Sequence, residues 1–149
     1  MSDLKLPKQA QVVIIGGGVI GCSVAYHLTK LGWSDVLLLE RKELTCGTTW
    51  HAAGLVGQLR ATRNMTMLAQ YTSELFARLE VETGQATGFK QNGSISVAPD
   101  QERFEELKRG ASMAKCFGLE VEVITAHEAL EIHPYINIDD LCGAVFLPK

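Results

Sequence analysis

The chain has 149 residues, of which 46% are hydrophobic and 21% are charged, and its net charge is −3. This length suits one modest domain with a real core, and the composition is typical of a globular protein. The small negative charge gives no electrostatic basis for binding nucleic acid. The longest apolar stretch, residues 12–22, is far shorter than the roughly 20 residues that span a bilayer. We therefore expect neither a nucleic-acid partner nor a membrane span.

The four cysteines show no CxxC spacing, so neither a metal site nor a disulfide framework is expected. This cysteine usage favours a reduced, cytoplasm-like compartment. Residues 1–7 lack the apolar core of a signal peptide and the arginine-rich character of a transit peptide. The predicted location is therefore the cytoplasm, with the mitochondrial matrix as the alternative.

The most informative segment is residues 11–40, which contain an apolar run, a glycine turn, a predicted helix and a second apolar run closed by Glu40. This order is what the pyrophosphate and ribose of a dinucleotide require. Gly16 allows the tight turn, Gly18 lets the backbone approach a phosphate, and Gly21 lets the helix pack closely on the strand. The continuous apolar run Val12–Ile15 predicts a parallel strand that is buried on both faces.

The predicted helix begins near Val19 and ends before Gly32. The N–H groups of its first turn lack intrahelical partners, and its dipole favours an anion there. Glu40 can accept hydrogen bonds from ribose hydroxyls and disfavours NADP, whose 2′-phosphate it would repel. The motif alone does not separate FAD from NAD. The bland alternative is a parallel α/β unit with a tight turn and no ligand.

The rest of the chain predicts further elements in order. Residues 41–58 form a long loop or short helix, followed by a helix over 64–83, a strand over 94–98, a helix capped by Asp100, a strand over 121–124, a short helix after the capping box of Thr125 and Glu128, and a strand over 141–147. The first of these helices carries an apolar stripe of Leu68, Tyr71, Leu75 and Leu79. The buried face of the Asp100 helix is expected to be Phe104, Leu107, Ala111 and Ala114. Only the strands near 12–15 and 35–40 clearly belong to a parallel sheet, so the nucleotide domain is begun and not completed.

The segment Glu43-Leu-Thr-Cys-Gly-Thr-Thr-Trp-His-Ala-Ala-Gly-Leu55 resembles the flavin-attachment segment of the dimethylglycine dehydrogenase and sarcosine dehydrogenase family. These proteins are FAD-dependent amine oxidases of the D-amino-acid oxidase type. The resemblance extends to residues 6–7, 80–84, 91–95 and 132–137, and it covers only the N-terminal part of the family's length. It implies an α/β fold, with a Rossmann-like FAD-binding domain and the start of an antiparallel substrate domain. We expect a truncated chain, with the dinucleotide-binding core and flavin loop in 1–62 and helices plus the first substrate-side strands in 63–149.

In that family the histidine of this segment is joined through an imidazole nitrogen to the 8α carbon of the flavin ring. The resemblance places this role on His51. Thr48 and Thr49 could donate hydrogen bonds to the pyrophosphate, and the small residues 52–54 would let the backbone lie against a flat ring. The candidate cofactor-binding residues are Gly16, Gly18, Val19, Ile20, Gly21, Glu40, Arg41, Gly47, Thr48, Thr49, His51, Ala53, Gly54 and Leu55. No catalytic residue is assigned, and the remaining histidines receive no catalytic role.

The implied reaction moves a hydride equivalent from the N-methyl carbon of a sarcosine-type or dimethylglycine-type amine to flavin. An electron-transfer flavoprotein or oxygen would take the electrons, and tetrahydrofolate could take the one-carbon unit in a full-length protein. The substrate-binding residues are expected beyond residue 149. One alternative is a non-catalytic relative such as the regulatory subunit of pyruvate dehydrogenase phosphatase, which lacks the Trp-His pair seen here at Trp50 and His51. The other is an NAD-binding domain.

Overall fold

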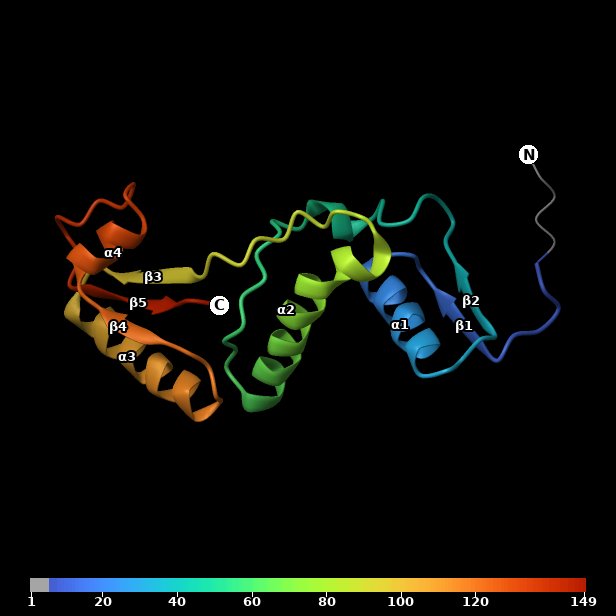
Figure 1. Ribbon diagram of the computed structural model, residues 1–149, viewed down its shortest axis with the longest axis horizontal. Helices are drawn as coiled ribbons and strands as arrows, with labels where there is room; N and C mark the ends of the chain where they lie inside the picture. The colour runs from blue at the N-terminus through green and yellow to red at the C-terminus, as the bar shows by residue number, and fades with distance from the viewer. Residues whose placement is uncertain (1–5) are drawn as a thin grey trace. The chain divides into compact units, whose positions relative to one another are not determined.

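The computed structural model describes residues 6–149 and divides the chain into two compact units (Figure 1). The first unit ends at Leu55 and the second begins at Val56. The predicted assignment of 1–62 to the nucleotide core and its loop stays a prediction, because this division reflects compactness alone. The expectation that residues 1–7 form neither a signal peptide nor a transit peptide is not tested, because residues 1–5 lie outside the described part of the chain.

The first unit contains the predicted strand, helix and strand in that order. Strand β1 is Val12–Ile15, helix α1 is Val19–Lys30 and strand β2 is Val36–Leu39. The two strands pair in parallel along their whole length, and α1 contacts both of them. Gly32 follows the end of α1 in the left-handed region with a φ of 90°, where glycine carries no steric cost. The prediction of a parallel β–α–β unit is therefore confirmed.

The predicted burial of β1 on both faces is wrong in this structure. Val12 and Ile14 are half-buried, whereas the side chains of Val13 and Ile15 are 49% and 89% exposed. A β-carbon added at Gly21 would lie 3.3 Å from the Ile14 Cγ2 atom, so Ile14 faces α1. The sheet has two strands among the described residues, and α1 covers one of its faces. A continuous apolar run is typical of a strand that is buried on both faces. In this structure α1 packs on one face of the sheet, and Val13 and Ile15 on the other face are exposed.

The second unit is built on an antiparallel sheet of three strands in the order β3–β5–β4. These strands are Ser94–Ala98, Gly143–Leu147 and Glu122–Ile124. Helix α3 (Gln101–Cys116) packs on β3 and β5, and α4 (Ala126–Ile132) packs on β5. The larger core cluster consists of Ala111, Ala114, Leu119, Val121, Val145 and Leu147. The prediction of a separate antiparallel element is confirmed.

The long helix α2, Arg63–Thr83, begins and ends close to the predicted residues. The Thr62 side chain caps it by accepting the Met65 N–H at 3.4 Å. Gly84 ends it in the left-handed region with a φ of 70°, as helices commonly end. The existence and bounds of this helix therefore followed from local sequence signals.

The predicted apolar stripe is not the buried face of α2. The buried residues are Thr66, Ala69 and Ser73, whereas Leu68 is 57% exposed and Tyr71 is 38% exposed. The Thr66 hydroxyl accepts the Arg60 N–H at 3.0 Å and donates to the Arg60 carbonyl at 3.1 Å. Hydrogen bonds to the segment before the helix thus select a small, polar face.

Both helices that follow β3 and β4 start at the predicted caps. The Asp100 carboxylate accepts the Arg103 N–H at 2.7 Å, and Ala111 and Ala114 are the buried residues of α3. Phe104 and Leu107, also expected on this face, are half-buried. The capping box at the start of α4 is complete, because the Thr125 hydroxyl accepts the Glu128 N–H while the Glu128 carboxylate accepts the Thr125 N–H.

The capping box gives α4 a pH dependence. The Thr125 N–H, at 2.7 Å, and then the Thr125 hydroxyl lower the pKa of Glu128 below its usual 4.5. The charged cap therefore stabilises the fold fully above pH 4.5, and this contribution is lost as the pH falls through the lower pKa of the folded state. We expect Glu128→Gln to lower the melting temperature at pH 7, and this deficit to shrink at about pH 3.5. Circular dichroism melts of both proteins test this, with Glu131→Gln on the same helix as control. A deficit that is equal at both pH values would contradict the assignment.

Candidate functional site

The glycine turn between β1 and α1 has the geometry that its predicted roles need. Gly16 has a φ of 104°, and its N–H donates to the Leu39 carbonyl at 2.8 Å. Gly18 is the N-cap residue of α1 and supplies no side-chain cap. A β-carbon at Gly21 would overlap the Gly16 carbonyl oxygen. The turn is therefore tight and closely packed against the helix.

Gly17 lies in the same turn and makes contacts that the sequence interpretation did not predict. A β-carbon there would lie 2.5 Å from the Leu44 Cδ2 atom, and the Gly17 carbonyl accepts the Thr45 N–H at 2.8 Å. Thr45 has a φ of 64°, which is rare for a β-branched residue. Strain of this kind gathers at functional sites. The run of three glycines was a signal for Gly17, but no local pattern marks the left-handed Thr45.

Glu40, directly after β2, braces the same turn. Its Oε2 atom accepts the Gly17 N–H at 2.8 Å, and its Oε1 atom accepts the Lys42 N–H at 3.0 Å. The hydrogen bond from Gly17 and then that from Lys42 hold the pKa of the Glu40 carboxyl below 4.5, so the group is ionised at neutral pH. A carboxylate offers about four acceptor positions. Glu40 can therefore accept further hydrogen bonds from hydroxyl donors.

The predicted flavin loop contains one turn of 3₁₀ helix, η1 (Thr48–His51), preceded by Gly47. The Thr49 Oγ1 atom accepts the Val19 N–H at 2.9 Å, which joins this turn to the first turn of α1. The rings of Trp50 and His51 lie with centroids 4.1 Å apart and planes tilted by 35°. The loop expected over residues 41–58 is thus a loop with a short helix.

All the candidate cofactor-binding residues lie in the first unit. Hydrogen bonds join Glu40 to the glycine turn and Thr49 to α1. Other candidates are placed at the surface: the side chains of Ile20 and Leu55 are 79% and 88% exposed. Arg41, Ala53 and Gly54 are also exposed, and Gly54 has a φ of 76°.

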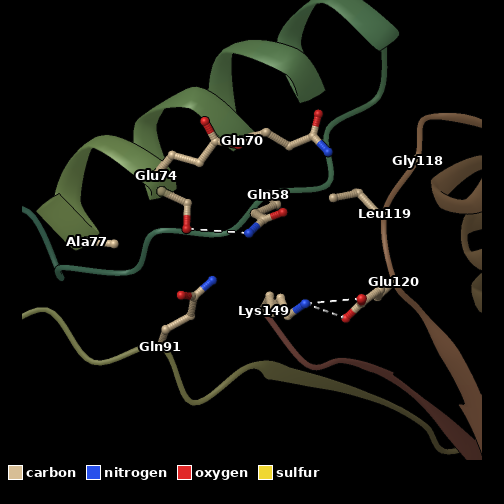
Figure 2. A pocket seen from close by; sticks show the side chains of 10 residues that line it. Gln58, Gln70, Glu74, Ala77, Gln91, Gly118, Leu119, Glu120 and Lys149 are labelled. Atoms are coloured by element: carbon tan, nitrogen blue, oxygen red, sulfur yellow. Dashed lines mark hydrogen bonds and ion pairs between the residues drawn. The ribbon is translucent and has the colours of Figure 1, made fainter.

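A separate concavity of about 290 Å³ lies within the second unit (Figure 2). Its lining is mostly polar, with an ion pair between Lys149 and Glu120 at 3.0 Å and a hydrogen bond from Gln58 to Ser73 at 3.4 Å. The other lining residues are Gln70, Glu74, Ala77, Gln91, Gly118 and Leu119. None of the candidate cofactor-binding residues lines it, so it is distinct from the predicted site.

Residues 6–149 contain no group of three or more His, Cys, Asp or Glu side chains that could hold a metal ion. None of their helices is both long and apolar enough to cross a membrane.

The glycine turn, the helix N-terminus and the acidic residue after β2 define a dinucleotide-binding β–α–β unit. Comparison with known families specifies the class of dinucleotide-binding protein. The family model DAO, described as FAD dependent oxidoreductase, matches residues 11–149. The chain belongs to this family.

The chain is also similar to curated relatives and to solved structures. Mitochondrial sarcosine dehydrogenase of Mus musculus is 46% identical over 97% of this chain and 16% of its own length. The mitochondrial pyruvate dehydrogenase phosphatase regulatory subunit of Mus musculus is 44% identical over 99% of this chain and 17% of its own length. Among solved structures, L-proline dehydrogenase from P. horikoshii matches with a TM-score of 0.88 and 29% identity, over 96% of this chain and 37% of that one. The chain therefore spans about a sixth of the length of these curated relatives.

Proposed function

We propose that this chain forms the FAD-binding part of a dehydrogenase that oxidises an N-methylated amine of the sarcosine or dimethylglycine type. The observation that carries the proposal is the Thr-Trp-His turn of η1, which is hydrogen-bonded to the N-terminus of α1 through Thr49 and Val19 at 2.9 Å. The family assignment supports FAD over NAD as the dinucleotide.

The donors and acceptors at this site fit FAD. The N–H groups of Ile20 and Gly21 in the first turn of α1 have no intrahelical acceptor and suit a pyrophosphate. A β-carbon at Gly18 would lie 3.1 Å from the Thr49 Oγ1 atom, so glycine leaves more room there than a residue with a side chain would. Glu40 is ionised and faces the turn, where it can accept hydrogen bonds from ribose hydroxyls. Arg41 and Gly47 flank this region in the sequence.

When bound, FAD would supply the acceptor for the hydride equivalent from the N-methyl carbon. The residues of this chain would bind and orient it, and the chain has no assigned catalytic residue. We propose an electron-transfer flavoprotein or oxygen as the electron acceptor, and tetrahydrofolate as a possible carrier of the one-carbon unit in the full-length protein.

We further propose that His51 holds the flavin covalently. The exposed imidazole lies on the same turn as Thr49. Its ring lies beside that of Trp50, with centroids 4.1 Å apart. A bond from an imidazole nitrogen to the 8α carbon replaces one hydrogen on each partner, so its formation also requires an electron acceptor. The small residues Ala53 and Gly54 follow at once, and they would let the backbone lie against the ring.

The second candidate is a non-catalytic relative like the phosphatase regulatory subunit. Overall identity does not separate the two, since the values are 46% and 44%. The observation that favours the dehydrogenase is His51 on the η1 turn, because an imidazole there is the group that a covalent flavin link would use. We therefore favour the amine dehydrogenase.

The compartment that we propose is the mitochondrion. The names of the sarcosine dehydrogenase and of the regulatory subunit both carry this location. Their location favours the matrix alternative over the cytoplasm that the cysteine usage suggested. Fractionation of cells that express the tagged full-length protein would test it.

The proposed function is tested by the visible flavin absorbance of the purified full-length protein before and after acid precipitation. We expect the colour to stay with the pellet, as covalent flavin does. Colour released into the supernatant would overturn the covalent link and keep the FAD site. A colourless protein that does not bind added FAD would overturn both and favour the non-catalytic relative.

A further inference from the structure

The N-terminus of α1 receives its side-chain hydrogen bond from a distant residue. Its N-cap residue, Gly18, has no side chain, and the Val19 N–H donates instead to the Thr49 Oγ1 atom, at 2.9 Å and 30 residues away. The neighbouring Thr48 hydroxyl has no hydrogen-bond partner within residues 6–149. Two adjacent threonines with the same side chain therefore occupy different environments.

The geometry at the N-terminus of α1 suits a hydroxyl group at position 49. A hydroxyl that accepts from a backbone N–H keeps its own proton for donation to a second acceptor. A β-carbon at Gly18 would lie 3.1 Å from the Thr49 Oγ1 atom, which is tighter than an ordinary contact, so the glycine leaves room for the hydroxyl as well as for a phosphate. Thr49 and His51 lie in the same short 3₁₀ helix, so the placement of Thr49 also restricts where His51 can lie.

We propose that Thr49 is a positioning residue that anchors η1 on the N-terminus of α1 and so fixes His51 for bond formation with the flavin. This inference rests on the proposed function of His51. Thr49 keeps its hydrogen bond from Val19 and donates its proton toward the anion held by α1. Trp50, whose ring lies beside that of His51, restricts the imidazole further.

The test compares Thr49→Val, Thr49→Ser and the control Thr29→Val in the full-length protein. Thr29 is exposed in the last turn of α1, where its hydroxyl donates to the Tyr26 carbonyl at 2.8 Å, so it takes no part in the proposed site. Valine keeps the shape of threonine and removes the hydroxyl, whereas serine keeps the hydroxyl. At saturating FAD we expect Thr49→Val to lower the rate of covalent flavin incorporation about fivefold or more, as the loss of one hydrogen bond predicts. Thr49→Ser and Thr29→Val should keep the rate near that of the unmodified protein. Equal rates in all four proteins, or an equal loss in all three variants, would overturn the proposal.

A second readout separates this proposal from the proposed function. Hydrogen exchange of the Val19 amide should be slow in the unmodified protein, in Thr49→Ser and in Thr29→Val, and faster in Thr49→Val. If the unmodified protein carries only noncovalent FAD, the role of His51 fails, and the exchange pattern still decides whether Thr49 anchors η1. A Val19 amide that exchanges equally in all four proteins would overturn the anchor even where covalent flavin forms.

Discussion

Substituting alanine for Gly21 is expected to destabilise the first unit by about 3 kcal/mol, the upper end of what overpacking typically costs, because the overlap is with backbone. The added β-carbon would overlap the carbonyl oxygen of Gly16, which belongs to backbone and cannot rotate away. Helix α1 must then move off β1, and the Val19 N–H moves with it. We therefore expect weaker FAD binding in Gly21→Ala together with the loss of stability.

Denaturant unfolding followed by tryptophan fluorescence measures this effect in the right unit, since Trp33 and Trp50 both lie before Leu55. Gly110, inside α3, is the matched control. A β-carbon there meets no atom within 4 Å, so Gly110→Ala should stabilise by about 0.5–1 kcal/mol, as glycine-to-alanine changes in helix interiors do. Circular dichroism reports that control. A fluorescence midpoint for Gly21→Ala equal to that of the unmodified protein would show that α1 does not pack on the turn as described.

The predicted elements that were confirmed depend on signals only a few residues apart. Gly16, Gly18 and Gly21 fix one turn, and a residue such as Asp100 caps the helix that begins next to it. The capping box of Thr125 and Glu128 is equally local. Such contacts form within a single turn of chain, so the order of residues is enough to predict them.

The features that sequence reasoning missed depend on tertiary contacts. The Gly17 N–H bonds to Glu40 across 23 residues, and nothing around either residue indicates that pairing. In α2 the apolar stripe predicted the helix, but hydrogen bonds between Thr66 and Arg60 decided which face is buried. Periodicity shows where apolar residues recur along the sequence. It does not show which hydrogen-bond partner a small polar residue will have in the fold. For the same reason the sequence offered Thr48 and Thr49 as equals, and only the fold distinguishes them.

Replacing His51 by alanine is expected to abolish covalent flavin while noncovalent FAD binding survives. The imidazole is the proposed attachment group, whereas the proposed phosphate and ribose contacts belong to α1, Thr49 and Glu40, which the substitution leaves in place. Protein-bound flavin in His51→Ala should therefore be released completely by acid. The measurement is the flavin absorbance of pellet and supernatant, with the FAD affinity determined separately by titration of the protein freed of flavin.

His127→Ala is the control, because His127 is exposed on α4 in the second unit and should leave covalent flavin unchanged. Acid-stable flavin in His51→Ala would move the attachment to another residue and leave the dinucleotide site intact. Loss of all FAD binding in His51→Ala would show that the imidazole shapes the site itself, since a tether alone does not set noncovalent affinity. The ring of Trp50 lies next to that of His51, so a collapse of the turn would also change the tryptophan fluorescence and make that second outcome testable. Release by acid with unchanged affinity and fluorescence is thus the result that assigns His51 the role of tether and nothing more.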